Sequence, residues 1–267
     1  MATIEEKFEN LKEYLRELGN VAVAFSSGVD STFLLKVAHE ILGEKAVAIT
    51  ASSEFFPARD IEDAKNFCLT ENIRQIILNE EILKIENIKN NPQNRCYICK
   101  KNLFSKIKTI AAENNLAHVV EGSNMDDNSD YRPGMKAIAE LDIKSPLRHA
   151  ELYKNEIRQL SKKLNLSTWD KPAFACLASR FVYGENITTE KLEMVERAEE
   201  LLRGKNFKQF RVRIHDKLAR IEILPSDFEK LLKLREEIVQ SFKNYGFDYV
   251  SLDLQGYRTG SMNIGLN

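Results

Sequence analysis

The residues best suited to chemistry follow the apolar run Val21–Phe25 and have the sequence Ser26-Ser27-Gly28-Val29-Asp30-Ser31. The run predicts a buried parallel strand, and the apolar spacing of residues 34–41 predicts a helix that ends before Gly43. A loop between a strand and a helix N-terminus binds anions, because free N–H groups and the positive end of the helix dipole point into it. The serine hydroxyls add donors, so we expect a phosphate site here.

Asp30 indicates which kind of anion this loop binds. A carboxylate inside an anion site requires a cation such as Mg²⁺, which accompanies nucleotide phosphates. No Gly-Lys-Ser/Thr sequence follows, so the loop is not a Walker loop. Gly28 lets the backbone approach the ligand closely, and we expect this position to tolerate no β-carbon. The alternative interpretation is an ordinary corner between a strand and a helix.

Cys96 and Cys99 form a C-x-x-C pair at an expected helix start. This spacing lets two thiolates bind one metal ion, although redox pairs and chance also produce it. Cys176 lies in the segment Trp169–Arg180, where by itself it would be a buried cysteine in an apolar loop. Together the three thiolates would leave a zinc ion or an iron–sulfur cluster with one open position, which implies chemistry. Cys68 lies between Phe67 and Leu69 and is expected in the core.

Strands that alternate with helices must position these residues. Strands are expected at 21–25, 45–50, 74–79 and 118–123, and helices at about 57–70 and 96–115. This alternation predicts an α/β fold with a parallel sheet. Ligands of such sheets bind beyond the carboxyl ends of the strands, where the loops 26–31, 51–56 and 122–134 fall.

The composition changes near residues 183–186, so we divide the chain into domains 1–183 and 184–267. The second domain is expected to be a small α+β unit with helices at 188–203 and 226–244 and strands at 210–215, 219–224 and 249–254. A four-residue hairpin loop would set Val212 opposite Ile223 and Arg213 opposite Glu222. One strand face would then carry Arg211, Arg213, His215, Arg220 and Glu222. A solvated polar face is the alternative interpretation.

Composition restricts the classes of partner. The 267 residues carry 39 Lys and Arg against 40 Asp and Glu, a net charge of −1, and 43% are hydrophobic. This balance predicts one or two soluble domains and favours a small-molecule substrate over nucleic acid. The N-terminal residues do not resemble a signal peptide, and no apolar stretch approaches membrane-spanning length. We therefore expect a cytoplasmic protein, where thiols stay reduced, with no membrane partner.

Five segments together resemble the LarE family of ATP-dependent sulfur transferases, over most of the chain. They are Ser26–Ser31, Gly122–Gly134, Ser145–Leu147, Trp169–Arg180 and Arg211–Glu222. The first is similar to the PP-loop, the Ser-Gly-Gly-x-Asp-Ser pyrophosphate-binding motif, with Ser27 where glycine is usual. The resemblance implies a parallel-sheet, adenine-nucleotide alpha-hydrolase-like domain (the PP-loop ATP pyrophosphatase fold) with a small C-terminal α+β domain.

The resemblance also implies a reaction. The family adenylates a carboxylate of pyridinium-3,5-biscarboxylic acid mononucleotide and converts it to a thiocarboxylate for the nickel-pincer nucleotide cofactor. In one branch, the cysteine matching Cys176 gives up its own sulfur and becomes dehydroalanine. In the other, three cysteines hold a [4Fe-4S] cluster that can carry an extra sulfide, and Cys96 and Cys99 assign this chain to that branch. The expected cofactors are ATP, Mg²⁺ and the cluster; sulfide or another donor is a partner, and a homo-oligomer is expected.

Candidate site residues follow from the motifs and the resemblance. Catalysis is assigned to Cys176, Asp30 and Arg180, and metal binding to Cys96, Cys99 and Cys176. The expected ATP site comprises Ser26, Ser27, Gly28, Asp30, Ser31, Ala51, Ser52 and Gly122. The expected substrate site comprises Asp126, Arg132, Ser179, Arg180, Arg211, Arg213 and Glu222.

Two other functions fit parts of the pattern. One is a different PP-loop enzyme, such as a tRNA thiolase or an amidotransferase synthetase. The near-neutral charge argues against tRNA, and no N-terminal catalytic cysteine is visible. The other is a non-catalytic nucleotide-binding protein in which the cysteines hold a structural zinc.

Overall fold

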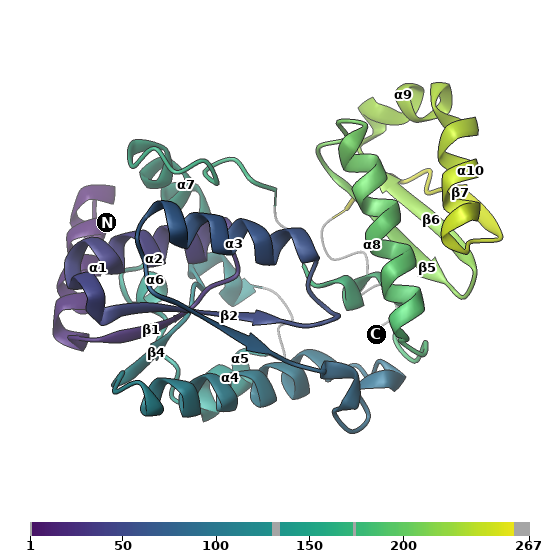
Figure 1. Ribbon diagram of the computed structural model, residues 1–267. Helices are drawn as coiled ribbons and strands as arrows, with labels where there is room; N and C mark the ends of the chain where they lie inside the picture. Colours follow the sequence, from purple (N-terminus) through teal and green to yellow (C-terminus); the bar gives the residue numbers. More distant parts are fainter. Residues whose placement is uncertain (1, 130–133, 173–174, 259–267) are drawn as a thin grey trace. The chain divides into compact units, whose positions relative to one another are not determined.

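The computed structural model describes residues 2–129, 134–172 and 175–258 (Figure 1). They form two compact units, which we call the N-terminal unit (Met1–Glu80 and Asn94–Phe174) and the C-terminal unit (Glu81–Gln93 and Ala175–Asn267). The segment 81–93 therefore packs with residues that follow it by about a hundred positions. The expected division into two domains at residue 183 stays a prediction.

The N-terminal unit is built on a four-stranded parallel sheet. Its strands are β1 (Val21–Ala24), β2 (Ala46–Ser52), β3 (Gln75–Asn79) and β4 (His118–Val120). Their order is β3-β2-β1-β4, and every neighbouring pair is parallel. The expected α/β class and parallel sheet are confirmed. The first strand lies in the interior of the sheet, so the loop that follows it lies between its neighbours.

Helices cover both faces of this sheet (Figure 1). One face packs against α1 (Ile4–Leu18), α2 (Val29–Leu42), α3 (Ala58–Thr70), α6 (Pro146–His149) and α7 (Lys154–Lys163). The other packs against α4 (Arg95–Glu113) and α5 (Gly134–Glu140). Val21 and Val23 belong to the first core and Ala22 to the second, as the two-residue period of a strand requires. Burial on both faces explains the uninterrupted apolar run before the loop.

The C-terminal unit contains a three-stranded sheet of order β5-β6-β7. Its regular elements are η2 (Ile82–Lys84), η3 (Ile88–Asn90), η5 (Leu177–Arg180), α8 (Thr189–Gly204), β5 (Phe210–His215), β6 (Leu218–Ile223), η6 (Pro225–Asp227), α9 (Phe228–Lys233), α10 (Arg235–Tyr245) and β7 (Tyr249–Leu252). The first two strands are antiparallel, and β7 runs parallel to β6. The single helix expected over 226–244 is instead two helices that meet at Leu234.

The expected register of the hairpin was wrong by two residues. Val212 lies opposite Ile221, and Arg211 lies opposite Glu222, because the turn contains only residues 216 and 217. Asp216 adopts a positive φ of 52°, which lets the chain reverse in this short turn. A shift of two residues preserves the faces, so the five polar side chains expected on one face still share it.

Candidate active site

Hydrogen bonds of its own serines stabilise the loop after β1. Ser31 Oγ accepts the Ser26 N–H at 3.3 Å, lies 3.1 Å from Ser26 Oγ and donates to the Gly28 carbonyl at 3.3 Å. Gly28 is the N-cap of α2, so the first N–H groups of that helix face the loop. This is the strand, loop and helix arrangement that binds phosphate.

Ser27 adopts the left-handed conformation, with φ of 53°. Glycine occupies such positions without a steric cost, which explains why the motif usually has glycine here. Ser27 is 2% exposed, and its hydroxyl donates to the Asp60 carbonyl at 2.9 Å. That hydrogen bond offsets part of the strain, and we propose that Ser27 shapes the loop instead of binding phosphate.

Gly122 is the sterically restricted glycine of this site. A β-carbon on Gly122 would lie 3.0 Å from the Ser31 nitrogen and 3.2 Å from the Asp30 carbonyl carbon. A β-carbon on Gly28 would have Ser26 Oγ as its nearest neighbour, at 3.6 Å, which is an ordinary contact. The expectation that Gly28 has no room for a β-carbon is therefore wrong for the protein atoms. Gly122 is instead the position where the end of β4 must approach the start of α2.

Two lysines at this loop were absent from the sequence-based candidates. Lys154 Nζ lies 2.5 Å from Asp30 Oδ2, and Lys171 Nζ donates to the Ser27 carbonyl at 3.2 Å. Lys171 also pairs with Asp63 of α3 at 3.0 Å. Neither lysine belongs to a recognisable motif near residue 30, so only the folded chain identifies them.

Asp30 retains one unsatisfied oxygen. Its Oδ1 is buried and has no hydrogen-bond partner in the described part of the chain. A buried acceptor without a partner is uncommon in proteins, and carboxylate oxygens are the ligands that Mg²⁺ prefers. The residues present therefore fit the expected metal ion, which Asp30 would hold beside the phosphates.

The other candidates of this unit lie on neighbouring loops. Ala51 and Ser52 end β2, and both are half-buried. Asp126 accepts the Lys154 backbone N–H at 2.6 Å and donates its own N–H to Asn124 Oδ1. Arg132 lies outside the described residues. The structure therefore links Asp126 to Asp30 through a single residue, Lys154.

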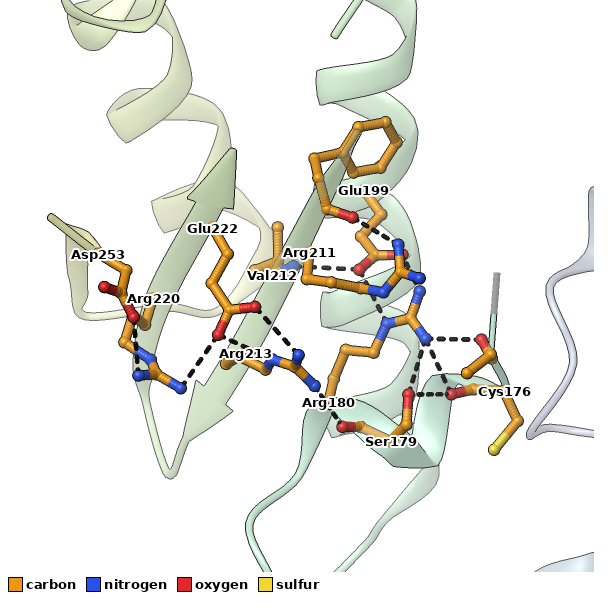
Figure 2. A network of polar contacts seen from close by, with 12 residues as sticks. Cys176, Ser179, Arg180, Glu199, Arg211, Val212, Arg213, Arg220, Glu222 and Asp253 are labelled. Atoms are coloured by element: carbon orange, nitrogen blue, oxygen red, sulfur yellow. Dashed lines mark hydrogen bonds and ion pairs between the residues drawn. The ribbon is translucent and has the colours of Figure 1, made fainter. Parts of the chain in front are cut away.

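The C-terminal unit holds a buried network of charged side chains around Arg180 (Figure 2). Arg180 is 1% exposed and forms two hydrogen bonds with the carboxylate of Glu199, at 2.8 and 2.7 Å. Its Nη1 donates to the carbonyls of Ala175 and Cys176 and to the hydroxyl of Ser179. We therefore propose Arg180 as a residue that positions the Cys176 segment, in place of the direct catalytic role first expected.

Cys176 is fixed through its backbone. Its carbonyl accepts from the Ser179 N–H at 3.0 Å, the Ser179 hydroxyl at 2.8 Å and the Arg180 guanidinium at 3.0 Å. Its side chain is half-buried, and Figure 2 shows the thiol directed away from this network. The contacts hold the backbone still while leaving the sulfur outside the hydrogen-bonded cluster.

The expected substrate residues of β5 and β6 belong to the same network. Arg213 donates to both carboxylate oxygens of Glu222 and to the Ser179 carbonyl, at 2.7 to 3.1 Å. Arg211 donates to the Phe210 carbonyl, and its guanidinium lies 5.3 Å from the ring of Tyr257. Burial and the neighbouring charge of Arg180 lower the pKa of Arg211 to about 10. A concentration of buried guanidinium groups favours an anionic ligand.

Removing Arg180 is expected to destabilise the protein strongly. Burial, the largest single effect, raises the pKa of Glu199. The charge and hydrogen bonds of Arg180, the charge of Arg211 and the Val212 N–H together outweigh burial and hold that pKa below the ordinary value. Arg180→Met leaves a buried carboxylate without its cation, so we expect a loss of about 3–5 kcal/mol in the free energy of urea unfolding at pH 7. The partly exposed pair Lys205–Glu237 provides a control, because Lys205→Met should cost less than about 1 kcal/mol.

The difference in unfolding free energy between the wild type and Arg180→Met should depend on pH, because the pKa of Glu199 is lowered in the folded protein. A carboxyl whose folded pKa is depressed stabilises the native state above its unfolded pKa and loses that contribution as the pH falls through the folded value. In Arg180→Met, burial favours the protonated acid. The difference in unfolding free energy between the wild type and Arg180→Met should therefore become smaller as the pH falls below about 4. If this difference in unfolding free energy stayed constant from pH 7 to pH 3, the ion pair between Arg180 and Glu199 would not be its source.

The cysteines of the expected cluster are divided between the units. Cys96 and Cys99 are half-buried within the first five residues of α4, and their three-residue spacing places them on one helix face. The Arg95 guanidinium donates to Cys96 Sγ at 3.9 Å, a contact that favours the thiolate. Cys176 belongs to the C-terminal unit. In the residues that the structure describes, no three His, Cys, Asp or Glu side chains form a group that could hold a metal ion.

Cys68 lies in the core of the N-terminal unit, as expected. It is 2% exposed, and burial raises the pKa of its thiol to about 12. A thiol with so high a pKa remains protonated, which suits a packing role.

Comparison with known proteins was consistent with this geometry. The family described as NAD synthase matches residues 3–178. An uncharacterised Synechocystis protein is 43% identical over 262 residues, which cover 97% of this chain and 98% of its own. Pyridinium-3,5-bisthiocarboxylic acid mononucleotide synthase of Lactiplantibacillus plantarum is 37% identical over 266 residues, 98% of this chain and 96% of its own. An uncharacterised Methanocaldococcus jannaschii protein is 33% identical over 256 residues, which cover 96% of this chain and 94% of its own.

The family model covers the loop that follows β1, and the full-length match to the Lactiplantibacillus plantarum protein also covers the network around Arg180. No helix among the described residues has the length and apolar character needed to cross a membrane. The chain therefore belongs to the NAD synthase group of PP-loop proteins and, within that group, to the LarE family of ATP-dependent sulfur transferases.

Proposed function

We propose that this enzyme uses ATP to activate a carboxylate of pyridinium-3,5-biscarboxylic acid mononucleotide and replaces one carboxylate oxygen with sulfur. The observation that carries the proposal is the 37% identity to the Lactiplantibacillus plantarum synthase over 98% of this chain. That length includes the phosphate loop, the three candidate ligand cysteines and the buried arginines. The product would be a thiocarboxylate for the nickel-pincer nucleotide cofactor.

The first step would take place at the loop after β1. A carboxylate oxygen of the substrate attacks the α-phosphorus of ATP, and the bond from that phosphorus to the bridging oxygen breaks. Pyrophosphate leaves with the electron pair of the broken bond, and an acyl adenylate remains. The helix N-terminus and the serine hydroxyls stabilise the charge that develops on pyrophosphate. Asp30 would hold Mg²⁺ against the same phosphates.

The second step would need a sulfur nucleophile. Sulfur attacks the acyl carbon, a carbon–sulfur bond forms, and the bond to the AMP oxygen breaks. A [4Fe-4S] cluster bound by three cysteines keeps one iron without a protein ligand, where hydrosulfide can bind. Cys96, Cys99 and Cys176 have the soft donor atoms for this role. In the alternative route, Cys176 itself would supply the sulfur.

The reaction can be tested with the purified full-length protein. Given ATP, Mg²⁺, sulfide and the dicarboxylate mononucleotide, the protein should release one pyrophosphate for each thiocarboxylate that mass spectrometry detects. A pyridinium mononucleotide without carboxylates should give neither product. Pyrophosphate release that is independent of the carboxylates would contradict the proposed substrate.

The number of products per chain distinguishes the two sulfur routes. With added sulfide, cluster-loaded enzyme should make several thiocarboxylates per chain while the mass of Cys176 stays unchanged. A sacrificial Cys176 could supply only one sulfur and would become lighter by the mass of H₂S. One product per chain with a converted Cys176 would overturn the cluster route and leave the family assignment intact. Cytoplasmic localisation and self-association remain predictions.

A further inference from the structure

Glu121 is a buried acid at the carboxyl end of β4. It is 6% exposed and directly follows Val120, the last residue of that strand. Each of its carboxyl oxygens accepts one hydroxyl hydrogen bond, from Ser123 at 2.7 Å and from Ser145 at 2.5 Å. Glu121 forms no ion pair with any residue that the structure describes. Burial of such a group is costly unless it is hydrogen-bonded, so the two hydroxyls take the place of the water that burial removes.

The hydrogen bond between Glu121 and Ser123 spans Gly122. Because these two residues are the chain neighbours of Gly122, a bond between their side chains closes a ring that restricts the Gly122 backbone. A β-carbon on Gly122 would lie 3.0 Å from the nitrogen of Ser31, in the first turn of α2. The position of Gly122 therefore determines how closely the end of β4 packs against the helix N-terminus that binds phosphate.

The hydrogen bond to Ser145 fixes the acid to a separate segment of the chain. Ser145 is the N-cap of α6, but its hydroxyl makes no capping hydrogen bond with that helix. An N-cap serine ordinarily accepts a helix N–H with this oxygen, whereas here the hydroxyl donates to Glu121. The Glu121 N–H also donates to the carbonyl of Lys144 at 3.0 Å. Glu121 is thus held to residues 144 and 145 through both its backbone and its side chain.

We propose that Glu121 is a positioning residue of the ATP site and acts through Gly122. Its two hydrogen bonds hold Gly122 against the first turn of α2, so that the N–H groups of that turn keep the arrangement that binds phosphate. Donors that are already ordered bind a ligand without the cost of ordering them. The inference rests on the proposed function only in requiring that this loop binds ATP. It is independent of the carboxylate substrate and of the sulfur source.

Calorimetry with Mg²⁺ and α,β-methylene-ATP, an analogue that cannot release pyrophosphate, tests this role in the full-length protein. Glu121→Ala should raise the Kd of the analogue roughly 10- to 30-fold, the range expected for the loss of two hydrogen bonds. The number of binding sites per chain should stay at the wild-type value. A variant that is only partly unfolded would instead show fewer sites with an unchanged Kd, and that result would contradict the proposal.

Glu121→Gln distinguishes positioning from a direct role of the charge. Glutamine offers a carbonyl to one hydroxyl and an N–H to the other, because a hydroxyl both donates and accepts. This variant should therefore restore the Kd to within about threefold of the wild type. A loss of affinity as large as that of Glu121→Ala would overturn the proposal, because the acid would then act through its charge.

Ser145→Ala tests whether the bond from α6 acts through Glu121. Alone, it should raise the Kd of the analogue about threefold, and in the Glu121→Ala background it should have no further effect, since the bond is already absent. An equal effect in both backgrounds would contradict the proposed path through Glu121.

Ser161→Ala provides the matched control for these variants. Ser161 of α7 is 0% exposed, and its hydroxyl has no hydrogen-bond partner among the described residues. Its removal should leave the Kd unchanged. Equal Kd values for the wild type and Glu121→Ala would overturn the proposal and leave Glu121 as a packing residue. Glu121-dependent binding of the analogue in a protein that forms no thiocarboxylate would instead refute only the proposed substrate.

Discussion

Asp30→Ala is expected to reduce pyrophosphate release at least about a hundredfold while leaving the fold intact. The carboxylate is the expected Mg²⁺ ligand at the phosphates, and a metal ion contributes several kcal/mol to stabilising the charge of such a transition state. The fold should tolerate the change, because one oxygen of Asp30 is buried without a partner and its removal offsets the lost pair with Lys154. Pyrophosphate release and the thermal midpoint Tm measure the two effects.

Glu40→Ala is the control for this prediction. Glu40 lies on the same helix α2 and pairs with Lys36 at 3.2 Å, but its side chain is 41% exposed and lies at the far end of the helix from the loop. We expect its pyrophosphate release to match the wild type within about twofold. Adenylation that survives Asp30→Ala would exclude this loop as the Mg²⁺–ATP site.

Replacing any of the three candidate ligand cysteines is expected to abolish sulfur transfer. Cys96→Ala, Cys99→Ala and Cys176→Ala should each lose the cluster, because two thiolates hold it poorly. Each variant should still release pyrophosphate, since adenylation uses the phosphate loop and no thiolate. The measurements are iron and sulfide content after anaerobic purification, together with pyrophosphate and thiocarboxylate per chain.

Cys68→Ala separates a ligand role from a packing role. Its buried thiol has a pKa of about 12, so the variant should keep iron and sulfur transfer and lose only about 1 kcal/mol of stability. If Cys96→Ala retained iron and multiple turnover, the three-ligand hypothesis would be wrong. A colourless protein that contains zinc would support the structural-metal alternative.

The architecture of the N-terminal unit was predictable from local patterns. Apolar runs indicated strands buried on both faces, and helical spacing indicated α2, α3 and α4, whose bounds fall close to the expected ones. The covering helices α1, α5, α6 and α7 were not among the expected elements. The loop 26–31 was recognisable because strand, small residues and helix follow one another directly in the chain. Such features depend on residues a few positions apart, so the sequence by itself determined them.

The tertiary structure alone decided which distant charges meet. Lys154 reaches Asp30 across 124 positions, and Arg180 reaches Glu199 only because η5 and α8 pack together. The register of the β5–β6 hairpin likewise depended on a two-residue turn that the pattern of polar side chains does not specify. Periodicity determines which face a side chain occupies, whereas its partner depends on how separate elements pack, and that packing is a property of the whole folded unit.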